Sequence, residues 1–330
     1  MLVEPEHDSL PRREHRGAAV SAVLSTAAVG FLAWAALPLF GLESNRYAIA
    51  LVALTQYAAV AGISLALLAL LLRRWLTALV VGLVSAALAY SVVPRAIPDS
   101  ARAAEGVPLR VLSLNAYVGQ ADAAQVVDLV RRNQVDVLSL QELTPQLVAA
   151  LDAAGLAGLL PYRVFHAGPK ADGSGIASRY PLRELSLVPP TTLAQPSALV
   201  DVPGARDVEF VAVHPLYPMG RGTADVWDRE LAALPQPSLD GRRRVLAGDF
   251  NATLDHARLR ELLDRGYTDA GASTGGGLSP TWPGQGAWFP PPVTIDHVLV
   301  GGGVSVNAYR VFDVAGTDHR AIFAHLTLTG

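Results

Sequence analysis

Three long apolar runs fill most of the first 95 residues and constrain the fold more than any other feature of the chain. They cover residues 18–40, 48–72 and 76–93, and none contains a charged residue. Each is close to the ~20 residues that an α-helix needs to cross the hydrocarbon core of a bilayer. A cleaved signal peptide accounts for one such run but not for three. A buried helical hairpin of a soluble protein is disfavoured because the runs are too long for core helices. The sequence therefore predicts three transmembrane helices over residues 18–93.

The arginines that flank these runs indicate how the chain is oriented. They are Arg12, Arg13 and Arg16 before the first run, and Arg73 and Arg74 between the second and the third. Positive residues concentrate on the cytoplasmic side of membrane proteins. We therefore expect a cytoplasmic tail over residues 1–17 and, after three crossings, an extracytoplasmic remainder, although Arg95 and Arg102 count slightly against this. The sequence predicts a multi-pass protein of the cell membrane, with a proline-containing linker over residues 94–108.

Composition excludes several classes of function. The mean hydropathy of +0.32 is high, and much of the apolar excess lies in the runs described above. There is no cysteine, so disulfides, thiolate metal sites and cysteine nucleophiles are excluded. A formal net charge of −3 argues against a dedicated nucleic-acid-binding protein, because such proteins usually carry a basic excess. We therefore do not expect nucleic acid as a partner.

From about residue 109 the pattern changes to short apolar runs that alternate with amphipathic stretches. A strand, a helix and a second strand are predicted over residues 109–143, followed by mostly β-strand pattern. This order favours layered α/β (α+β) architecture over a doubly wound sheet. No glycine-rich phosphate-binding motif follows a strand, so dinucleotide and P-loop sites have no support. We therefore expect one α/β domain over residues 109–330.

A long glycine- and proline-rich loop is predicted over residues 271–292, and long loops in compact domains are often functional. Its aromatic residues are Trp282, Trp288 and Phe289. Aromatic rings favour the membrane interface, so these side chains either enter the membrane interface or pack over the domain core. Both alternatives remain open from the sequence.

Polar residues stand at the ends of several predicted strands. They are Asn115, Glu142, His214, Asp249, Asn251, Asp296, Asp318 and His319. Any one of them has a structural explanation as a turn, a cap or a buried histidine. Together they are harder to dismiss, because sites are commonly built where a rigid sheet presents its loops.

The stretch VLAGDFN at residues 245–251 is the clearest case in which a structural and a functional explanation compete. On an extended backbone Asp249 and Asn251 lie on the same side, and Phe250 points to the other. A carboxylate and an amide side by side suit a site for a metal and a phosphate, but the same residues suit a tight polar turn. Both interpretations stay open on this stretch alone.

Five short motifs in this order resemble the endonuclease/exonuclease/phosphatase superfamily with the DNase I-like fold. They are LN at 114–115, QE at 141–142, GDFN at 248–251, IDH at 295–297 and TDH at 317–319. The segment GIASRYPL at 175–182 is also similar to the family. The resemblance covers residues 109–328 and implies a four-layer β-sandwich, with two packed sheets flanked by helices and the site at one rim.

The same resemblance implies a divalent cation held by Glu142, Asn115 and Asp318. Mg²⁺ is the expected ion, with Mn²⁺ as the alternative, since a hard cation prefers carboxylate oxygens. Asn115 and Asn251 are also expected to bind a phosphate oxygen of the substrate.

The resemblance further implies catalytic roles for five residues, among them Asn251. Asp249 is expected to orient and activate the attacking water. His319 is expected to contact the phosphate, and Asp296 to fix its ring, as carboxylates do for imidazoles. His214 matches the histidine that some members use as the acid for the leaving group.

Function is expected to follow from this site and the membrane anchor together. A multi-pass anchor with an outward catalytic domain resembles actinobacterial membrane proteins associated with teicoplanin resistance. This implies a phosphatase on lipid-linked cell-wall intermediates similar to undecaprenyl pyrophosphate, with the lipid bilayer as partner. The alternatives are an extracytoplasmic nuclease, a phosphodiesterase on phospholipids and, in another class, a non-catalytic membrane scaffold.

Four further residues are assigned no role in the site. His166 and His256 match no motif and are expected at the surface, and His297 is expected to point to the opposite side of its strand from Asp296. Tyr117 is expected to pack rather than to line the site, because aromatic side chains mostly do.

Overall fold

The computed structural model describes residues 11–329 except 100–104, 206, 239–240 and 285, with side chains from Ala18 onward. The chain forms two compact units, each described by itself below. The helical unit is Met1–Leu42 with Thr55–Ser91, and the sandwich unit is Glu43–Leu54 with Val92–Gly330. Residues 1–10 of the predicted cytoplasmic tail lie outside the described residues, and residues 11–17 form the start of a helix.

The helical unit contains α1 (Pro11–Phe40), α3 (Thr55–Leu71) and α4 (Trp75–Val92). Small residues let these helices approach closely: a Cβ at Gly62 would lie 2.3 Å from both the Phe31 ring and the Ser85 hydroxyl. In the described part of the chain, two helical stretches are long and apolar enough to cross a membrane, namely Ala18–Phe40 and Trp75–Ala96.

The second predicted span is broken. Its first part is the separate helix α2 (Arg46–Ala53). The chain bends by 69° between the α2 and α3 helices, and Leu54 is the one residue between them. Asn45 caps α2 by accepting hydrogen bonds from two backbone N–H groups of its first turn. The bent pair provides a third crossing only if it counts as one span.

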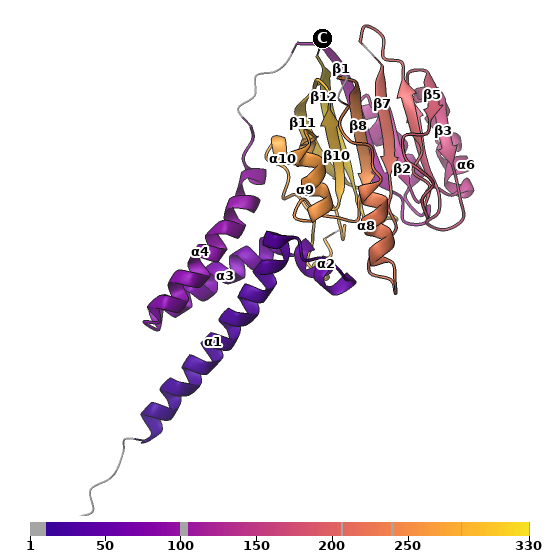
Figure 1. The fold of residues 1–330 in the computed structure, drawn as a ribbon. Coiled ribbons are helices and arrows are strands. Elements are labelled where there is room, and N and C mark those ends of the chain that lie inside the picture. Colours follow the sequence, from indigo (N-terminus) through magenta and orange to yellow (C-terminus); the bar gives the residue numbers. More distant parts are fainter. Residues whose placement is uncertain (1–10, 100–104, 206, 239–240, 285, 330) are drawn as a thin grey trace, which may run out of the picture. The chain divides into compact units, whose positions relative to one another are not determined.

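The sandwich unit is built from two six-stranded sheets that lie face to face (Figure 1). The first contains, in spatial order, β11 (Val304–Asp313), β12 (Arg320–Leu328), β1 (Val107–Asn115), β2 (Val137–Gln141), β4 (Ser174–Ser178) and β3 (Tyr162–His166). The second contains β5 (Leu182–Leu185), β6 (Ser197–Val200), β7 (Val208–Val213), β8 (Arg243–Asp249), β10 (Asp296–Gly301) and β9 (Thr268–Asp269).

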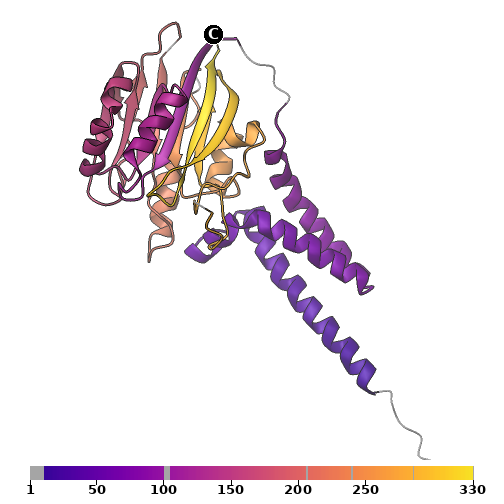
Figure 2. The same ribbon diagram turned by 180° about the vertical axis from the view of Figure 1, so that it is seen from behind.

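Helices cover the outer face of each sheet, which confirms the DNase I-like two-sheet α/β domain. Figure 2 shows α5 (Ala123–Arg132), α6 (Pro145–Ala153) and α7 (Leu156–Leu159) over the first sheet. On the second sheet lie α8 (Ala224–Ala232) and α9 (Ala257–Asp264), with α10 (Ala270–Ser273) beside β9 (Figure 1). Asp122 and Thr144 cap α5 and α6 through their side-chain oxygens.

Strict alternation along the strands fills the space between the sheets. On β1, Leu109 and Val111 point into the central core, whereas Leu112 and Leu114 pack against the outer helices. Each such buried side chain contributes ~1.5–3 kcal/mol relative to exposure. The side chains that point into the space between the sheets become polar near the strand ends. Ser139 of β2, for example, donates a 2.9 Å hydrogen bond to the Ala247 carbonyl of the other sheet. Polar groups therefore enter the space between the sheets at the ends of their strands.

Two parallel pairs determine where those strand ends meet. β1 pairs parallel with β2, and β7 pairs parallel with β8, while the other neighbours are antiparallel. Parallel strands end at the same edge, and antiparallel neighbours begin there. Asn115 and Asp249 therefore end strands at this edge, and Asp296, which faces Asp249 across the β8–β10 ladder, begins one.

The short helix α2 packs on the sandwich unit. Ile49 joins the apolar cluster under α8 and α9, and its carbonyl lies 3.1 Å from the His256 Nε2. The Ala257 N–H donates a 2.6 Å hydrogen bond to the Glu43 Oε1, and burial raises the pKa of Glu43 to about 7. The expectation that His256 lies at the surface is wrong: the residue is 1% exposed, because its ring contacts Trp227 and both its nitrogens have partners.

The start of the predicted linker is also docked on the sandwich unit. Arg95 forms a two-pronged ion pair with Asp255 at 3.0 and 2.8 Å, and the Asp99 N–H donates to the Ser273 carbonyl. Residues 100–104 of the linker lie outside the described residues.

The first prediction concerns the glycine of the GDFN motif. A Cβ at Gly248 would lie 2.0 Å from the Val213 carbonyl oxygen, a backbone atom that cannot move aside. We expect Gly248→Ala to destabilise the sandwich unit by about 3 kcal/mol, the upper end of what overpacking costs. Thermal unfolding of the full chain in detergent measures this. Gly158→Ala, where a Cβ meets nothing within 4 Å, is the control; equal midpoints for the two variants would contradict the prediction.

The second prediction concerns the attachment of α2 at low pH. Burial lowers the pKa of His256 from 6.5 to about 4. A depressed histidine pKa means that this contribution to stability is complete above pH 6.5 and is lost as the pH falls through 4. At ~1.4 kcal/mol per pH unit the loss approaches about 3 kcal/mol.

The test compares thermal unfolding of the wild type and His256→Gln between pH 7 and pH 4. The glutamine can still donate to the Ile49 carbonyl but does not titrate, so the wild type should lose stability more steeply. Parallel pH curves would refute the assignment.

Candidate active site

The amide of Asn115 lies at the centre of the predicted residues. Its Nδ2 donates to the Glu142 Oε1 at 3.2 Å and to the Asp249 Oδ2 at 3.0 Å. Its Oδ1 accepts the Tyr117 N–H at 2.9 Å, which fixes the amide with its nitrogen toward the carboxylates. The side chain is 1% exposed and connects the end of β1 in one sheet to the end of β8 in the other.

Glu142 reaches the site through an unusual backbone conformation. As the residue after β2 it follows Gln141, whose side chain points inward, so alternation would direct Glu142 outward; its φ of 55° turns it back. Its Oε2 accepts the Val118 N–H at 2.5 Å, and Val118 itself has a φ of 54°. Such conformations are uncommon outside glycine, especially for a β-branched residue, and they cluster at functional sites. The same turn leaves Tyr117 43% exposed, so the expectation that it packs is wrong.

The GDFN segment is both a tight turn and part of the site. Asp249 continues the inward row of β8, and its Oδ1 accepts the Asn251 N–H at 2.7 Å. Asn251 has a φ of 50°, so it does not continue the extended strand on which the same-side expectation was based. Its Nδ2 donates to the Pro215 carbonyl at 3.2 Å. In this turn the backbone N–H of Asn251 binds Asp249, and its side-chain amide binds the Pro215 carbonyl.

His319 is held between two carboxylates. Its Nδ1 lies 2.9 Å from the Asp296 Oδ2, and its Nε2 lies 3.7 Å from the Asp249 Oδ2. Burial alone lowers the pKa of the imidazole, but the charges of Asp296 and Asp249 and the hydrogen bond to Asp296 outweigh it and raise the pKa to about 10. His319 therefore carries a positive charge at neutral pH.

His214 has the opposite character. It is 2% exposed, and burial lowers its pKa, so its ring is neutral at neutral pH. Its Nε2 lies 4.0 Å from the Glu142 Oε1, and its buried Nδ1 has no hydrogen-bond partner among the described residues. The site thus contains one charged and one neutral imidazole.

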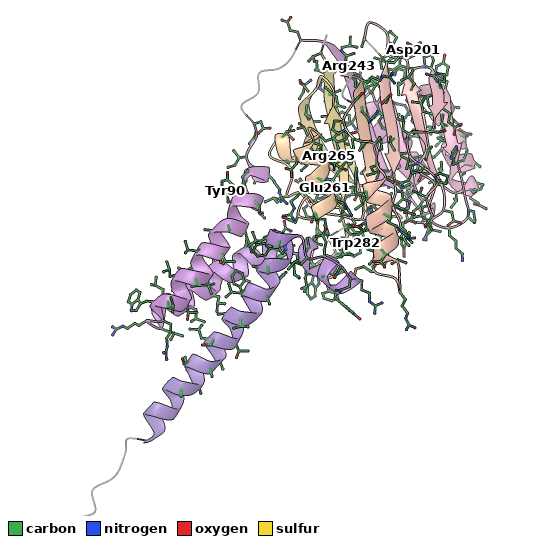
Figure 3. The ribbon with its side chains drawn as sticks, in the orientation of Figure 1. Tyr90, Asp201, Arg243, Glu261, Arg265 and Trp282 are labelled. Atoms are coloured by element: carbon green, nitrogen blue, oxygen red, sulfur yellow. The ribbon has the colours of Figure 1, made fainter. Side chains whose placement is uncertain are left out.

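Asp318 lies at the margin of this network. Its Oδ2 accepts a 3.1 Å hydrogen bond from the Trp282 Nε1, and its buried Oδ1 has no partner among the described residues. Trp282 is therefore held against the site and lies at the opposite end of the sandwich from Arg243 and Asp201 (Figure 3). The other two aromatic residues of the loop, Trp288 and Phe289, are 82% and 74% exposed.

Three residues that position the site were not predicted. The Thr317 hydroxyl donates to the Asn115 carbonyl at 2.8 Å and accepts the His319 N–H at 3.0 Å. The Thr281 hydroxyl accepts the Ile295 and Asp296 N–H groups, and the Gln195 Oε1 accepts the His214 N–H. Thr317 begins the TDH motif and was open to prediction, whereas Thr281 and Gln195 lie in loops without a pattern. His297 points away from the site, as expected, and binds Asp269 at 3.0 Å.

The donor atoms suit a hard divalent cation. Within the described residues, ligand atoms of Asp249, Asp296 and His319 lie within 4.8 Å of one another. Because a protonated His319 can only donate, a metal ion at this position would be held by the two carboxylates. This group differs from the predicted set of Glu142, Asn115 and Asp318. The unpartnered oxygen of Asp318 is a further candidate ligand, whereas Asn115 faces the carboxylates with its nitrogen and not its oxygen.

Comparison with known proteins shows the family of the chain. The sequence profile of the Endonuclease/Exonuclease/phosphatase family matches residues 112–319, a range that contains all eight predicted residues. Members of this family are typically hydrolases of phosphoester bonds and generally depend on a divalent metal. No curated protein matches the chain.

Solved structures share the fold. An endonuclease/exonuclease/phosphatase from Beutenbergia cavernae DSM 12333 superposes with a TM-score of 0.53 and 20% identity, covering 68% of this chain and 72% of the other. D. rerio TDP2 humanized by 14 mutations gives a TM-score of 0.51 and 18% identity, covering 67% and 99%. Truncated Caenorhabditis elegans TDP2 gives 0.50 and 16% identity, covering 68% and 100%. At these identities the likeness concerns the fold.

The third prediction tests the amide between the carboxylates. Asn115→Asp replaces the donor that serves Glu142 and Asp249 with a third acidic group. We expect the free energy of unfolding at pH 7 to fall by about 3–5 kcal/mol, the cost of an uncompensated buried charge. The loss should shrink as the pH is lowered and the new carboxyl is protonated.

Urea unfolding of the full chain at pH 7 and pH 5 measures this difference. Asn133→Asp, at the half-buried end of α5, is the control; it loses the hydrogen bond to the Leu129 carbonyl and places an acid at a helix C-terminus, so it should cost only about 1 kcal/mol. An Asn115→Asp variant as stable as that control would show that the amide does not hold the carboxylates together.

Proposed function

Because the chain belongs to the Endonuclease/Exonuclease/phosphatase family, we propose that it is a membrane-anchored, metal-dependent phosphoesterase that hydrolyses lipid-linked phosphates of the cell envelope. The observation that supports a catalytic role best is the convergence at one edge of Asn115, Glu142, His214, Asp249 and His319. These side chains come from separate strands of two sheets. A non-catalytic scaffold has no need of this arrangement.

The side chains suggest how water attacks phosphorus. Asp249 accepts a proton from the water and orients it, while the Asn251 amide binds a phosphate oxygen. The charged His319, oriented by Asp296, offsets the negative charge that develops on the phosphoryl oxygens. His214, which burial keeps neutral, donates a hydrogen bond to the leaving oxygen rather than acting as an imidazolium.

Glu142 and Asp318 are the residues we propose as ligands of Mg²⁺, or of Mn²⁺. Glu142 presents a carboxylate toward the site, and Asp318 has an oxygen without another partner. We assign Asn115 the role of positioning Glu142 and Asp249. A bound hard cation supplies Lewis-acid stabilisation of the phosphoryl oxygens.

The membrane anchor supports a lipid-borne substrate. We propose that α1, α3 and α4 cross the membrane and that α2 lies outside the bilayer core, so that the arginine pattern directs the sandwich unit to the extracytoplasmic side. The short linker over residues 94–108 joins the sandwich unit to the last membrane helix. This tether raises the effective concentration of lipid phosphates at the site. Hydrolysis of an undecaprenyl pyrophosphate-like intermediate would alter the supply of cell-wall precursors and with it glycopeptide susceptibility.

The fourth prediction is phosphate release from undecaprenyl pyrophosphate by the full-length protein in detergent. We expect release with Mg²⁺, none with EDTA, and a ~10²–10⁴-fold lower rate for Asp249→Asn, as removal of a general base produces. Asp201→Asn, at the opposite end of the sandwich, is the matched control and should keep wild-type activity (Figure 3). Release that survives EDTA or Asp249→Asn would contradict the mechanism.

The same assay with single-stranded DNA and with sphingomyelin distinguishes the alternative substrates. Activity confined to one of these would replace the lipid pyrophosphate with a phosphodiester. Absence of metal-dependent hydrolysis on every substrate, by protein that unfolds cooperatively, would favour a scaffold.

A further inference from the structure

An apolar cavity of about 270 Å³ lies beside the candidate active site, within the sandwich unit. One wall is α2 and its end; the others are the loops after β7 and β8 and the loop before β10. Its lining includes Ile49, Ala50, Ala53, Met219, Trp282 and Val293. We call this cavity the α2 groove. Its lining is almost entirely apolar, unlike the active site next to it.

The α2 groove adjoins the candidate active site through shared and hydrogen-bonded residues. Asn251 lines the groove, and its backbone N–H donates to the Asp249 Oδ1. Trp282, another lining residue, donates to the Asp318 Oδ2, and Ile295 precedes Asp296. A molecule with its phosphate at Asp249 and His319 would therefore have the groove within reach of the atoms next to that phosphate.

Two parts of the groove lining are followed or preceded in the sequence by apolar segments. Leu54 lines the groove and is the one residue between α2 and the apolar helix α3. Pro290 and Pro291 line another wall, directly after the exposed pair Trp288 and Phe289. Exposed aromatic and apolar side chains of this kind favour a membrane interface.

We propose that the α2 groove binds the part of a hydrocarbon tail that is nearest the phosphate of the substrate. This inference rests on the proposed function and narrows the substrate to phosphates esterified to a single extended apolar chain. A volume of about 270 Å³ is at the low end for ligand pockets, so the groove holds the first part of the tail and not the whole lipid. A double-chained phospholipid head group would not enter it in this way.

The fifth prediction uses the series dimethylallyl, geranyl, farnesyl and geranylgeranyl pyrophosphate with the full-length protein in detergent and Mg²⁺. We expect kcat/KM to rise at least ~10-fold from the dimethylallyl to the farnesyl substrate, because each added apolar unit is buried in the α2 groove. The rise should then level off once the groove is filled. The gain should appear mainly in KM.

Ala53→Trp fills the groove and tests the assignment. We expect this variant to lose the rise with tail length, so that its kcat/KM for the farnesyl substrate falls ~10-fold toward its own dimethylallyl value. Leu51→Trp places the same side chain on the exposed side of α2, outside the groove lining, and should keep the wild-type profile. If Ala53→Trp does not fold, Met219→Trp fills the groove from the opposite wall and decides the question.

The outcomes separate this inference from the proposed function. No hydrolysis of any member of the series or of undecaprenyl pyrophosphate would overturn the proposed function itself. Hydrolysis of undecaprenyl pyrophosphate alone would keep that function and overturn the role of the groove, because a groove that holds only the first part of the tail should already favour the farnesyl substrate. Hydrolysis that is independent of tail length, or a length dependence that survives both groove-filling variants, would leave the phosphoesterase intact and overturn the role of the groove.

Discussion

The rest of the site depends on the hydrogen bonds that the Asn115 amide donates to two carboxylates. Asn115 is the inward-facing end of β1 in the first sheet, yet it binds both Glu142 of its own sheet and Asp249 of the other. Two carboxylates repel each other when they are buried together, and a donor between them offsets that repulsion. Two parallel strand pairs bring these ends to one edge, and the Asn115 amide connects the two sheets there.

The positions of the strand ends could be predicted from the sequence, and their backbone conformations could not. Alternation along β1 and β8 places Asn115 and Asp249 on the inward side, because the same periodicity that buries Val111 and Val245 continues to the last residue. It fails at Glu142 and Asn251, which adopt left-handed conformations. Periodicity describes extended chain and carries no information about the residue at which the chain turns. The strand-end pattern named both residues, and the family resemblance supplied their expected roles.

Long-range partners were the other feature beyond the reach of the sequence. His256 matches no motif and appeared to be a surface residue, but the Ile49 carbonyl, 207 positions away, occupies its Nε2. Thr281 and Gln195 accept hydrogen bonds from the backbone N–H groups of Asp296 and His214, respectively. Both lie in loops whose paths are determined by the fold. A side chain whose role is to hold another one has no periodicity of its own. Such residues become visible only when the packing is known.

The break at Leu54 shows a feature of the second apolar run that hydropathy alone does not reveal. Burial against a protein core and burial in lipid select the same residue types, so α2 and α3 look like one span. The buried residues of α2 gather on one side, where Ile49 meets the sandwich unit, whereas α3 is apolar on all sides. The α2 helix lies between α1 and α3 in the sequence and gives the sandwich unit an apolar wall beside the carboxylates of the candidate active site. The proposed substrate, a phosphate with an apolar tail, would contact both this apolar wall and the polar residues of the candidate active site, whereas a soluble phosphate would contact only the polar residues.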